Sequence, residues 1–177
     1  MTFINIEIKA KCFHPQTVEA FLVSGNAVFQ GTDHQTDTYF HVPRGRLKLR
    51  KGNIENNLIY YERNDQQGPK QSDFRLFPVH EHDTLLAILT ASLGIKVVVE
   101  KFRKIYFLDN IKVHLDEVPG LGSFVEIEAS NLHHTDLPVE TLRRQCTSLM
   151  HSFGITENDL LTNSYSDMKL ELGFDQH

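Results

Sequence analysis

Alternation of apolar and polar positions with a period of two dominates the amino-terminal part of this sequence. In residues 4–11, isoleucine or alanine occupies every second position, and the positions between them are Asn5, Glu7, Lys9 and Lys11. Successive side chains of a β-strand point to opposite faces of the strand. The pattern therefore predicts a first strand with one apolar face and one face that carries charge.

Three further segments repeat this alternation with charges of a single sign. Cations occupy residues 46–50 and 101–103, and carboxylates occupy residues 124–128. The charged residues are Arg46, Lys48, Arg50, Lys101, Arg103, Glu126 and Glu128, and Asp116 alternates with His114 in a similar way. For any single strand, the solvated side of a half-buried sheet is the alternative interpretation. Because an ordinary solvent face mixes signs, we interpret these rows as facing a shared lumen that binds a polyphosphate and its metal.

The rest of the chain predicts more strands and fewer helices. Strands are expected at 28–32, 36–42, 57–63, 72–77, 96–101, 103–108, 112–118 and 123–129. Helices are expected at 14–24, 84–93 and 138–153, and a capping box from Thr156 to Asp159 begins a last short helix. An open sheet of so many two-faced strands would leave long exposed edges. We therefore predict an α+β fold in which about eight antiparallel strands form a closed or nearly closed barrel, with a tunnel inside and helices packed outside.

Composition limits where and how such a fold works. The 177 residues are 40% hydrophobic and 23% charged without a Pro/Gly/Ser-rich linker, so we expect one domain over residues 1–177. Cys12 and Cys146 are far apart in the sequence, which favours free thiols over a disulfide or a zinc site. A net charge of −5 argues against a nucleic-acid partner. The lack of a long apolar run or a signal peptide argues against a membrane and favours the cytoplasm.

The charged residue types suit a phosphate chain together with a divalent ion. Arginine offers a planar fork of donors and lysine a point charge, and several of each are needed to clamp successive phosphates. Mg²⁺ takes one or two carboxylates at about 2.0–2.1 Å, and phosphate and water fill its other positions. Glu7, Glu126 and Glu128 would suit Mg²⁺ or Mn²⁺ in this way.

One long motif and several short ones match a known pattern. Residues 115–128 read LDEVPGLGSFVEIE, and shorter matches lie at 7–9, 37–40, 45–50, 68–70, 101–103 and 162–168. Together they resemble the CYTH superfamily of triphosphate tunnel metalloenzymes, and its class IV adenylyl cyclase-like branch in particular. The resemblance covers nearly the whole chain and implies an antiparallel barrel whose tunnel holds a triphosphate. Members convert ATP to cAMP and pyrophosphate, or hydrolyse inorganic or thiamine triphosphate.

By position, the resemblance also implies a role for individual residues. Glu7, Glu126 and Glu128 would hold Mg²⁺ or Mn²⁺, and Asp116 would be a further acidic ligand or an orienting residue. Glu7, Lys9 and Asp116 would form the catalytic set. Phosphates would be bound by Lys9, Arg46, Lys48, Lys70, Lys101 and Arg103, with Lys11, Arg50 and Arg75 as further candidates. The partner would be ATP or inorganic or thiamine triphosphate, and relatives suggest a homodimer.

The sequence departs from the family pattern in places that bear on activity. The family opens with Glu-x-Glu-x-Lys, and the first glutamate is Asn5 here. After Lys70, relatives often carry an arginine followed by glutamates, whereas Arg75 is followed by Leu-Phe-Pro in this chain. Tyr60 and Tyr61 stand where relatives often place a lysine. Three functions stay open: a cyclase first, a triphosphatase second, and a module that binds nucleotide or polyphosphate without turnover third.

Overall fold

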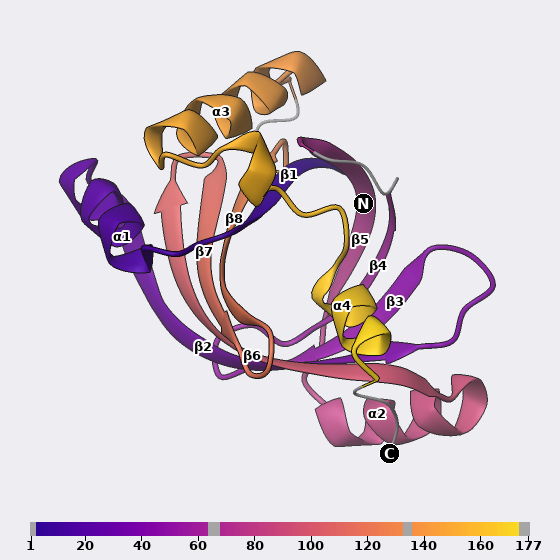
Figure 1. The fold of residues 1–177 in the computed structure, drawn as a ribbon. Helices are drawn as coiled ribbons and strands as arrows, with labels where there is room; N and C mark the ends of the chain where they lie inside the picture. The colour runs from indigo at the N-terminus through magenta and orange to yellow at the C-terminus, as the bar shows by residue number, and fades with distance from the viewer. Residues whose placement is uncertain (1–2, 64–67, 133–135, 174–177) are drawn as a thin grey trace.

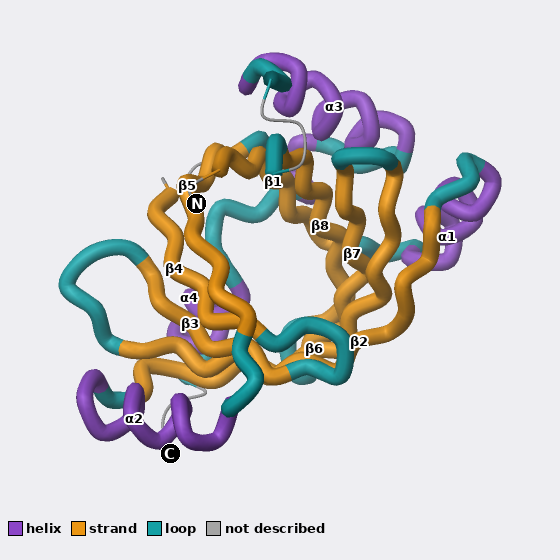
Figure 2. Tube along the Cα trace, turned by 180° about the vertical axis from the view of Figure 1, so that it is seen from behind, coloured by secondary structure: helices purple, strands orange, loops and turns teal. Residues whose placement is uncertain are grey.

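The strands follow one another around a closed ring. The computed structural model describes residues 3–63, 68–132 and 136–173, and within these ranges eight strands close the ring in the order β1-β5-β4-β3-β2-β6-β7-β8. They are β1 (Phe3–Lys11), β2 (Val28–Phe40), β3 (Arg46–Lys51), β4 (Asn57–Arg63), β5 (Lys70–Pro78), β6 (Ile95–Leu108), β7 (Ile111–Val118) and β8 (Gly122–Ser130). Every neighbouring pair is antiparallel, and β8 pairs back onto β1 (Figures 1 and 2). The predicted closed antiparallel barrel is confirmed.

Two predicted pairs of strands are each one long strand. Segments 28–32 and 36–42 belong to β2, and segments 96–101 and 103–108 belong to β6, with β2 and β6 paired along their lengths. The sequence analysis treated the polar residues near position 34 as a break in the first pair. Asp33 and Gln35 are instead buried and hydrogen-bonded to each other, so β2 passes through them without interruption.

Helices cover the apolar outside of the barrel. They are α1 (Pro15–Ser24), α2 (His82–Leu93), α3 (Val139–Ser152) and α4 (Tyr165–Glu171), with a 3₁₀ turn η1 (Glu157–Asp159). In Figure 1, α1 and α3 lie beside β1, β7 and β8, and α2 lies on another side of the ring. Ile6 and Ile127 of the sheet pack in one core with Leu142 of α3 and with the free, buried thiols of Cys12 and Cys146. With apolar residues outside, the charged strand faces point into the barrel.

The carboxy-terminal segment crosses one end of the barrel in front of the ring (Figure 1). The Leu161 N–H donates to the Lys9 carbonyl at 2.9 Å, which fixes this crossing to β1. The segment then enters α4, where Ser164 and Asp167 form a capping box. The sequence analysis missed α4, because it ended at the Thr156 capping box, which begins only the single turn η1. The Ser-x-x-Asp cap was the signal that could have located it. Among the described residues, no helix has the length and apolar character to cross a membrane.

Candidate functional site

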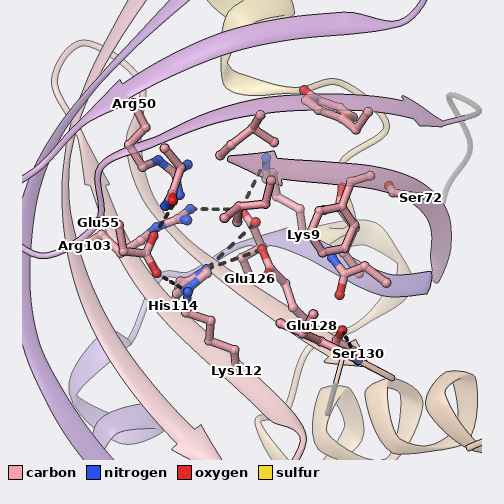
Figure 3. Close-up of a pocket in the computed structure, with 18 of the residues that line it drawn as sticks. Lys9, Arg50, Glu55, Ser72, Arg103, Lys112, His114, Glu126, Glu128 and Ser130 are labelled. Carbon is pink, nitrogen blue, oxygen red and sulfur yellow. Dashed lines mark hydrogen bonds and ion pairs between the residues drawn. The ribbon is translucent and has the colours of Figure 1, made fainter. Parts of the chain in front are cut away.

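The inward faces of the strands enclose a cavity of about 380 Å³ (Figure 3). Alternate residues of most strands of the barrel line it, as the period-two pattern requires, and β2 contributes Tyr39. Of the charged residues predicted to face a lumen, those that line this cavity are Glu7, Lys9, Lys48, Arg50, Lys101, Arg103, Glu126 and Glu128. The structure thus brings cations and carboxylates from separate strands into one space.

Carboxylates and an imidazole gather on β1, β7 and β8. The strand register places Glu126 between Lys9 of β1 and His114 of β7, and it places Glu7 directly opposite Glu128. Lys9 Nζ lies 3.4 Å from Glu126 Oε2. Donor atoms of His114, Glu126 and Glu128 all lie within 4.8 Å of one another. Because metal–ligand bonds in proteins are about 2.0–2.2 Å, this cluster has nearly the size that a single ion would bridge.

The two glutamates of β8 have opposite pKa shifts. Burial raises the pKa of Glu128 to about 8, and the neighbouring charge of Glu126 acts in the same direction. Burial also opposes ionisation of Glu126, but Lys9 and Arg103 outweigh it and hold the pKa of that carboxyl well below its usual range. A negative charge on Glu128 is therefore poorly compensated by the protein, and a bound cation would stabilise it.

His114 presents nitrogen donors without partners. Its side chain is 1% exposed, and within the described part of the chain neither ring nitrogen makes a hydrogen bond. Nδ1 lies 3.6 Å from Glu128 Oε1 and 3.9 Å from Glu126 Oε1. Burial, assisted by Arg103, lowers the pKa of His114 to about 3, so the ring is neutral and able to bind a metal. Ring nitrogens without a hydrogen bond, next to the carboxylates of Glu126 and Glu128, form a set of ligand atoms that suits a divalent metal ion. The sequence analysis missed this donor, although its alternation with Asp116 placed it on the lumen face.

Asp116 and Tyr165 hold Arg103 in place. Arg103 Nε and Nη2 donate to the two oxygens of Asp116, both at 2.6 Å, and Nη2 also donates to Glu126 Oε2 at 3.2 Å. The Tyr165 hydroxyl donates to Asp116 Oδ2 at 2.7 Å. Burial opposes ionisation of Asp116, but Arg103 prevails and lowers its pKa. Both carboxylate oxygens of Asp116 thus accept hydrogen bonds from Arg103 or Tyr165.

Asp37 organises the cations on the opposite wall. Its side chain is fully buried and accepts hydrogen bonds from Arg50 Nε at 2.8 Å, Lys101 Nζ at 2.9 Å and Lys48 Nζ at 3.1 Å. Burial opposes ionisation, but these three cations hold the pKa of Asp37 well below its usual range. Burial, together with Arg103 and Arg50, lowers the pKa of Lys101 to about 7. The sequence analysis placed the segment of Asp37 in a motif but assigned it no role.

Comparison with known proteins identifies the family of this barrel. The CYTH domain model matches residues 4–165. The chain belongs to the CYTH domain family. The resemblance in the sequence is thereby confirmed, and the barrel with its central cavity is the triphosphate tunnel fold of that family. A search of curated proteins found no match.

Solved structures share this CYTH fold at low sequence identity. A protein of Pyrococcus horikoshii is 24% identical with a TM-score of 0.77, over 92% of this chain and 98% of that chain. An adenylate cyclase candidate from Vibrio parahaemolyticus is 16% identical with a TM-score of 0.76, over 93% of this chain and 97% of that chain. A Hippeastrum adenylyl cyclase candidate with a dominant triphosphatase activity is 12% identical with a TM-score of 0.57, over 98% and 97% of the two chains. These similarities establish the fold.

The connection between β3 and β4 places the carboxylate of Glu55 inside the CYTH tunnel. This carboxylate was not predicted from the sequence. Glu55 accepts a hydrogen bond from Arg50 Nη1 at 2.9 Å and also binds Lys112, and all three residues line the cavity. Asp33 fixes the connection by accepting the Glu55 backbone N–H at 3.0 Å. A Cβ on Gly52 would lie 2.6 Å from both oxygens of Asp33, so glycine is needed at that position. No local sequence pattern indicates that this loop turns inward.

Four predicted phosphate-binding residues lie elsewhere in the CYTH barrel. Lys70 is buried at the start of β5, and its Nζ donates to the carbonyls of Leu161 and Thr162 at 3.1 and 2.5 Å, so it fastens the carboxy-terminal segment. Arg46 Nη2 pairs with Asp167 of α4 at 3.0 Å, beside a separate small cavity. The remaining two are exposed: Lys11 at the end of β1 and Arg75 on the outer face of β5.

One end of the CYTH tunnel is apolar. Phe3 at the start of β1 packs edge-to-face against Phe74 of β5, with ring centroids 3.8 Å apart. Leu76 and Leu132 also line the cavity and are partly exposed, at 43% and 37%. The opposite end is covered by Tyr165, whose ring lies 3.9 Å from Lys9 Nζ. Charged side chains therefore lie toward the covered end, and apolar side chains lie near the start of β1, beside the polar Asn110 and Ser130.

Proposed function

We propose that this protein is a metal-dependent enzyme acting on triphosphate compounds, and that it converts ATP to cAMP and pyrophosphate as class IV adenylyl cyclases do. The observation that carries the proposal is the convergence of lysines, arginines and carboxylates inside one closed barrel. Mixed charges that meet in an enclosed cavity interact more strongly than they would in bulk water. Such a cavity is suited to an anion that arrives with its own divalent cation.

The cations of the cavity would hold the triphosphate and then the leaving pyrophosphate. Lys9, Lys48, Lys101 and Arg103 line the cavity from three of its walls. In the proposed reaction the ribose 3′-hydroxyl gives its proton to solvent, its oxygen forms a bond to the α-phosphorus, and the bond from that phosphorus to the bridging oxygen breaks so that pyrophosphate leaves. Phosphoryl chemistry of this kind depends mainly on positioning and on charge that is arranged in advance. Because Asp116 fixes Arg103 with two hydrogen bonds, this guanidinium is ordered before substrate arrives.

Glu7, Glu126 and Glu128 would hold the divalent ion. A divalent ion bound there would neutralise negative charge on the phosphate oxygens. Lys9, which is paired with Glu126 at 3.4 Å, limits the excess negative charge of this corner until a cation is present.

The apolar end of the tunnel favours a triphosphate ester over inorganic triphosphate. Phe3, Phe74, Leu76 and Leu132 offer surface that an inorganic anion cannot use, whereas a nucleoside can bury its base and sugar against it. The phosphates would then lie toward Lys101 and Arg103, and the organic group toward the start of β1.

Hydrolysis of inorganic or thiamine triphosphate is the second candidate function. It is supported by the similarity to the Hippeastrum protein, whose dominant activity is that of a triphosphatase. In this case water would attack the terminal phosphorus, and the same cations would stabilise the charge on the phosphates.

Turnover assays distinguish these functions. The full chain is incubated with Mn²⁺ or Mg²⁺ and with ATP, thiamine triphosphate or inorganic triphosphate, and cAMP and orthophosphate are measured. Formation of cAMP supports the cyclase, and orthophosphate release without cAMP supports the hydrolase. Glu126→Ala should abolish either activity, whereas Glu100→Ala, at an exposed pair with His34, should retain it. Calorimetric binding of substrate without any product would overturn the enzyme proposal in favour of a binding module, for which Asn5 at the family's first glutamate is the motivation.

A further inference from the structure

We infer that His114 is a nitrogen ligand of the metal ion in the tunnel, and that it makes the site selective for first-row transition ions such as Mn²⁺ over Mg²⁺. The inference rests on the proposed function in that the metal belongs to the same site. It goes further because it names a donor outside the carboxylate set that the family resemblance implied, and because it predicts which metal is preferred.

The geometry around His114 points to a missing partner. Its side chain is 1% exposed, and both ring nitrogens lack a hydrogen bond within the described residues. Nδ1 is closest to carboxylate oxygens, at 3.6 Å from Glu128 and 3.9 Å from Glu126. These distances are too long for hydrogen bonds. They are within the separation of two ligands on one ion, which is at most about 4.4 Å for bonds of about 2.2 Å.

The neighbouring residues explain why a histidine is available to the metal and an aspartate is not. Asp116, two residues along the same face of β7, accepts hydrogen bonds from Arg103 and Tyr165. A buried histidine with a purely structural role would show the same kind of satisfied contacts. His114 makes no hydrogen bond in the described structure and approaches Glu128 and Glu126 only at ion-pair distances, although it lies directly opposite Glu126 in the register of β7 and β8. Figure 3 shows His114 and Glu126 pointing toward one another inside the cavity.

Ligand chemistry then sets the preference. Mg²⁺ takes oxygen ligands, whereas imidazole suits first-row transition ions such as Fe²⁺, Ni²⁺ and Zn²⁺; Mn²⁺ stands at the weak end of that series and also accepts oxygen ligands. A site of one imidazole and two carboxylates should therefore favour a transition ion over Mg²⁺. Mn²⁺ is the best probe, because its unpaired electrons report directly on the nuclei that are bound to it.

The experiment measures the metal's ligands and does not depend on turnover. Mn²⁺ is titrated into the purified full chain, its binding is followed by electron paramagnetic resonance, and pulsed experiments detect ¹⁴N coupled to bound Mn²⁺. Mg²⁺ competition gives the selectivity. The variants are His114→Asn, His114→Asp and the control His34→Asn, which alters an exposed histidine that pairs with Glu100. Thermal unfolding shows whether each variant is folded.

We expect imidazole ¹⁴N coupling in the wild type and in His34→Asn, and none in His114→Asn or His114→Asp. Mn²⁺ affinity should fall about tenfold in His114→Asn, a loss typical for a change in a metal's ligand environment, and His114→Asp should lose most of the preference over Mg²⁺. If wild-type protein binds Mn²⁺ in a Glu128-dependent manner without ¹⁴N coupling, the inference is wrong while the proposed function stands. If no Mn²⁺ binds in the presence or absence of triphosphate, both are wrong.

Discussion

Asp37 and Glu128 are carboxyls on different walls of the barrel interior, one fully buried and the other 22% exposed, yet their pKa values shift in opposite directions. At Asp37, hydrogen bonds from Arg50, Lys48 and Lys101 outweigh the cost of burial. At Glu128, burial and the neighbouring Glu126 raise the pKa to about 8. The cations around Asp37 compensate its charge, whereas the protein supplies too little positive charge around Glu128 to keep that carboxyl ionised at neutral pH. We therefore expect the first centre to be structural and the second to take up a cation.

Among the substitutions that test this comparison, removal of the Asp37 carboxylate should change the free energy of unfolding most. Asp37→Ala leaves three clustered cations without their shared carboxylate, and breaking a buried ion pair from one side costs about 3–5 kcal/mol. Denaturant unfolding should show a loss of that size, with partial recovery when inorganic triphosphate is added. Asp83→Ala, which breaks an exposed pair with Lys51, should change stability little. Equal losses in the two variants would show that Asp37 is not a structural centre.

The second-largest effect should be stabilisation of the folded state by Mn²⁺. It should depend on the residues around Glu128 and not on those around Asp37. At a Mn²⁺ concentration about one hundred times the dissociation constant, the folded state gains about 2.7 kcal/mol. Thermal unfolding of the wild type should therefore shift upward with Mn²⁺, whereas Glu128→Gln should shift little. Lys48→Met, which alters the Asp37 wall, should keep the metal response. A Mn²⁺ shift that survives in Glu128→Gln would remove the distinction between the walls.

The pH dependence of the Asp37 wall gives a smaller effect. The folded-state pKa of Lys101 is about 7, below the ordinary lysine value of 10.5, because burial and neighbouring cations disfavour its charge. Between these values the unfolded chain binds more protons, so the free energy of unfolding should rise with pH, by about 2 kcal/mol between pH 7 and 9. The raised pKa of Glu128 acts in the opposite sense, since its contribution is lost as pH rises toward 8. The free energy of unfolding is therefore measured against pH in Glu128→Gln and in the double variant that also carries Lys101→Met. If it still rises with pH in the double variant, Lys101 is not the group responsible.

Glu55 offers the smallest and most specific test. Its carboxylate accepts hydrogen bonds from Arg50 and Lys112, which line the cavity, so it competes with an incoming anion for these cations. Glu55→Gln should raise the affinity for inorganic triphosphate about fivefold, as calorimetry would measure, because a partly buried charge interaction is worth about 1 kcal/mol. Glu62→Gln, at an exposed residue bonded to Tyr60, is the matched control and should leave the affinity unchanged. Weaker binding in Glu55→Gln would show that Glu55 supports the cation site and does not compete for it.

The parts of the site that follow strand periodicity could be predicted before the structure. Residues such as Lys9, Lys48 and Glu126 alternate with apolar neighbours, so their shared face follows from the sequence. Arg75 shows the limit of that reasoning. It lies one residue out of phase with Phe74 and Leu76, which line the cavity, and its exposed side chain belongs to the outer face.

Contacts between distant segments could not be predicted in this way. Lys70 donates hydrogen bonds to backbone carbonyls of the carboxy-terminal segment, and Arg46 forms an ion pair with Asp167 of α4. Both contacts exist because that segment passes over the end of the barrel. Neither partner is a neighbour in sequence or strand register. Glu55 reaches the cavity only because Asp33 captures the backbone of its loop from another strand. Such pairings depend on how the closed ring places its loops and its chain end.

The sequence by itself determined the barrel and the charge of its interior, because period-two alternation assigns each side chain to a face and exposed edges oblige two-faced strands to close. Only the tertiary structure decided which charges are already satisfied. Asp37 is matched with three cations, Asp116 with Arg103 and Tyr165, and Glu128 with too few. That division arises from strand register and burial, which set the distance and the dielectric surroundings of each pair, and neither can be read from the order of residues.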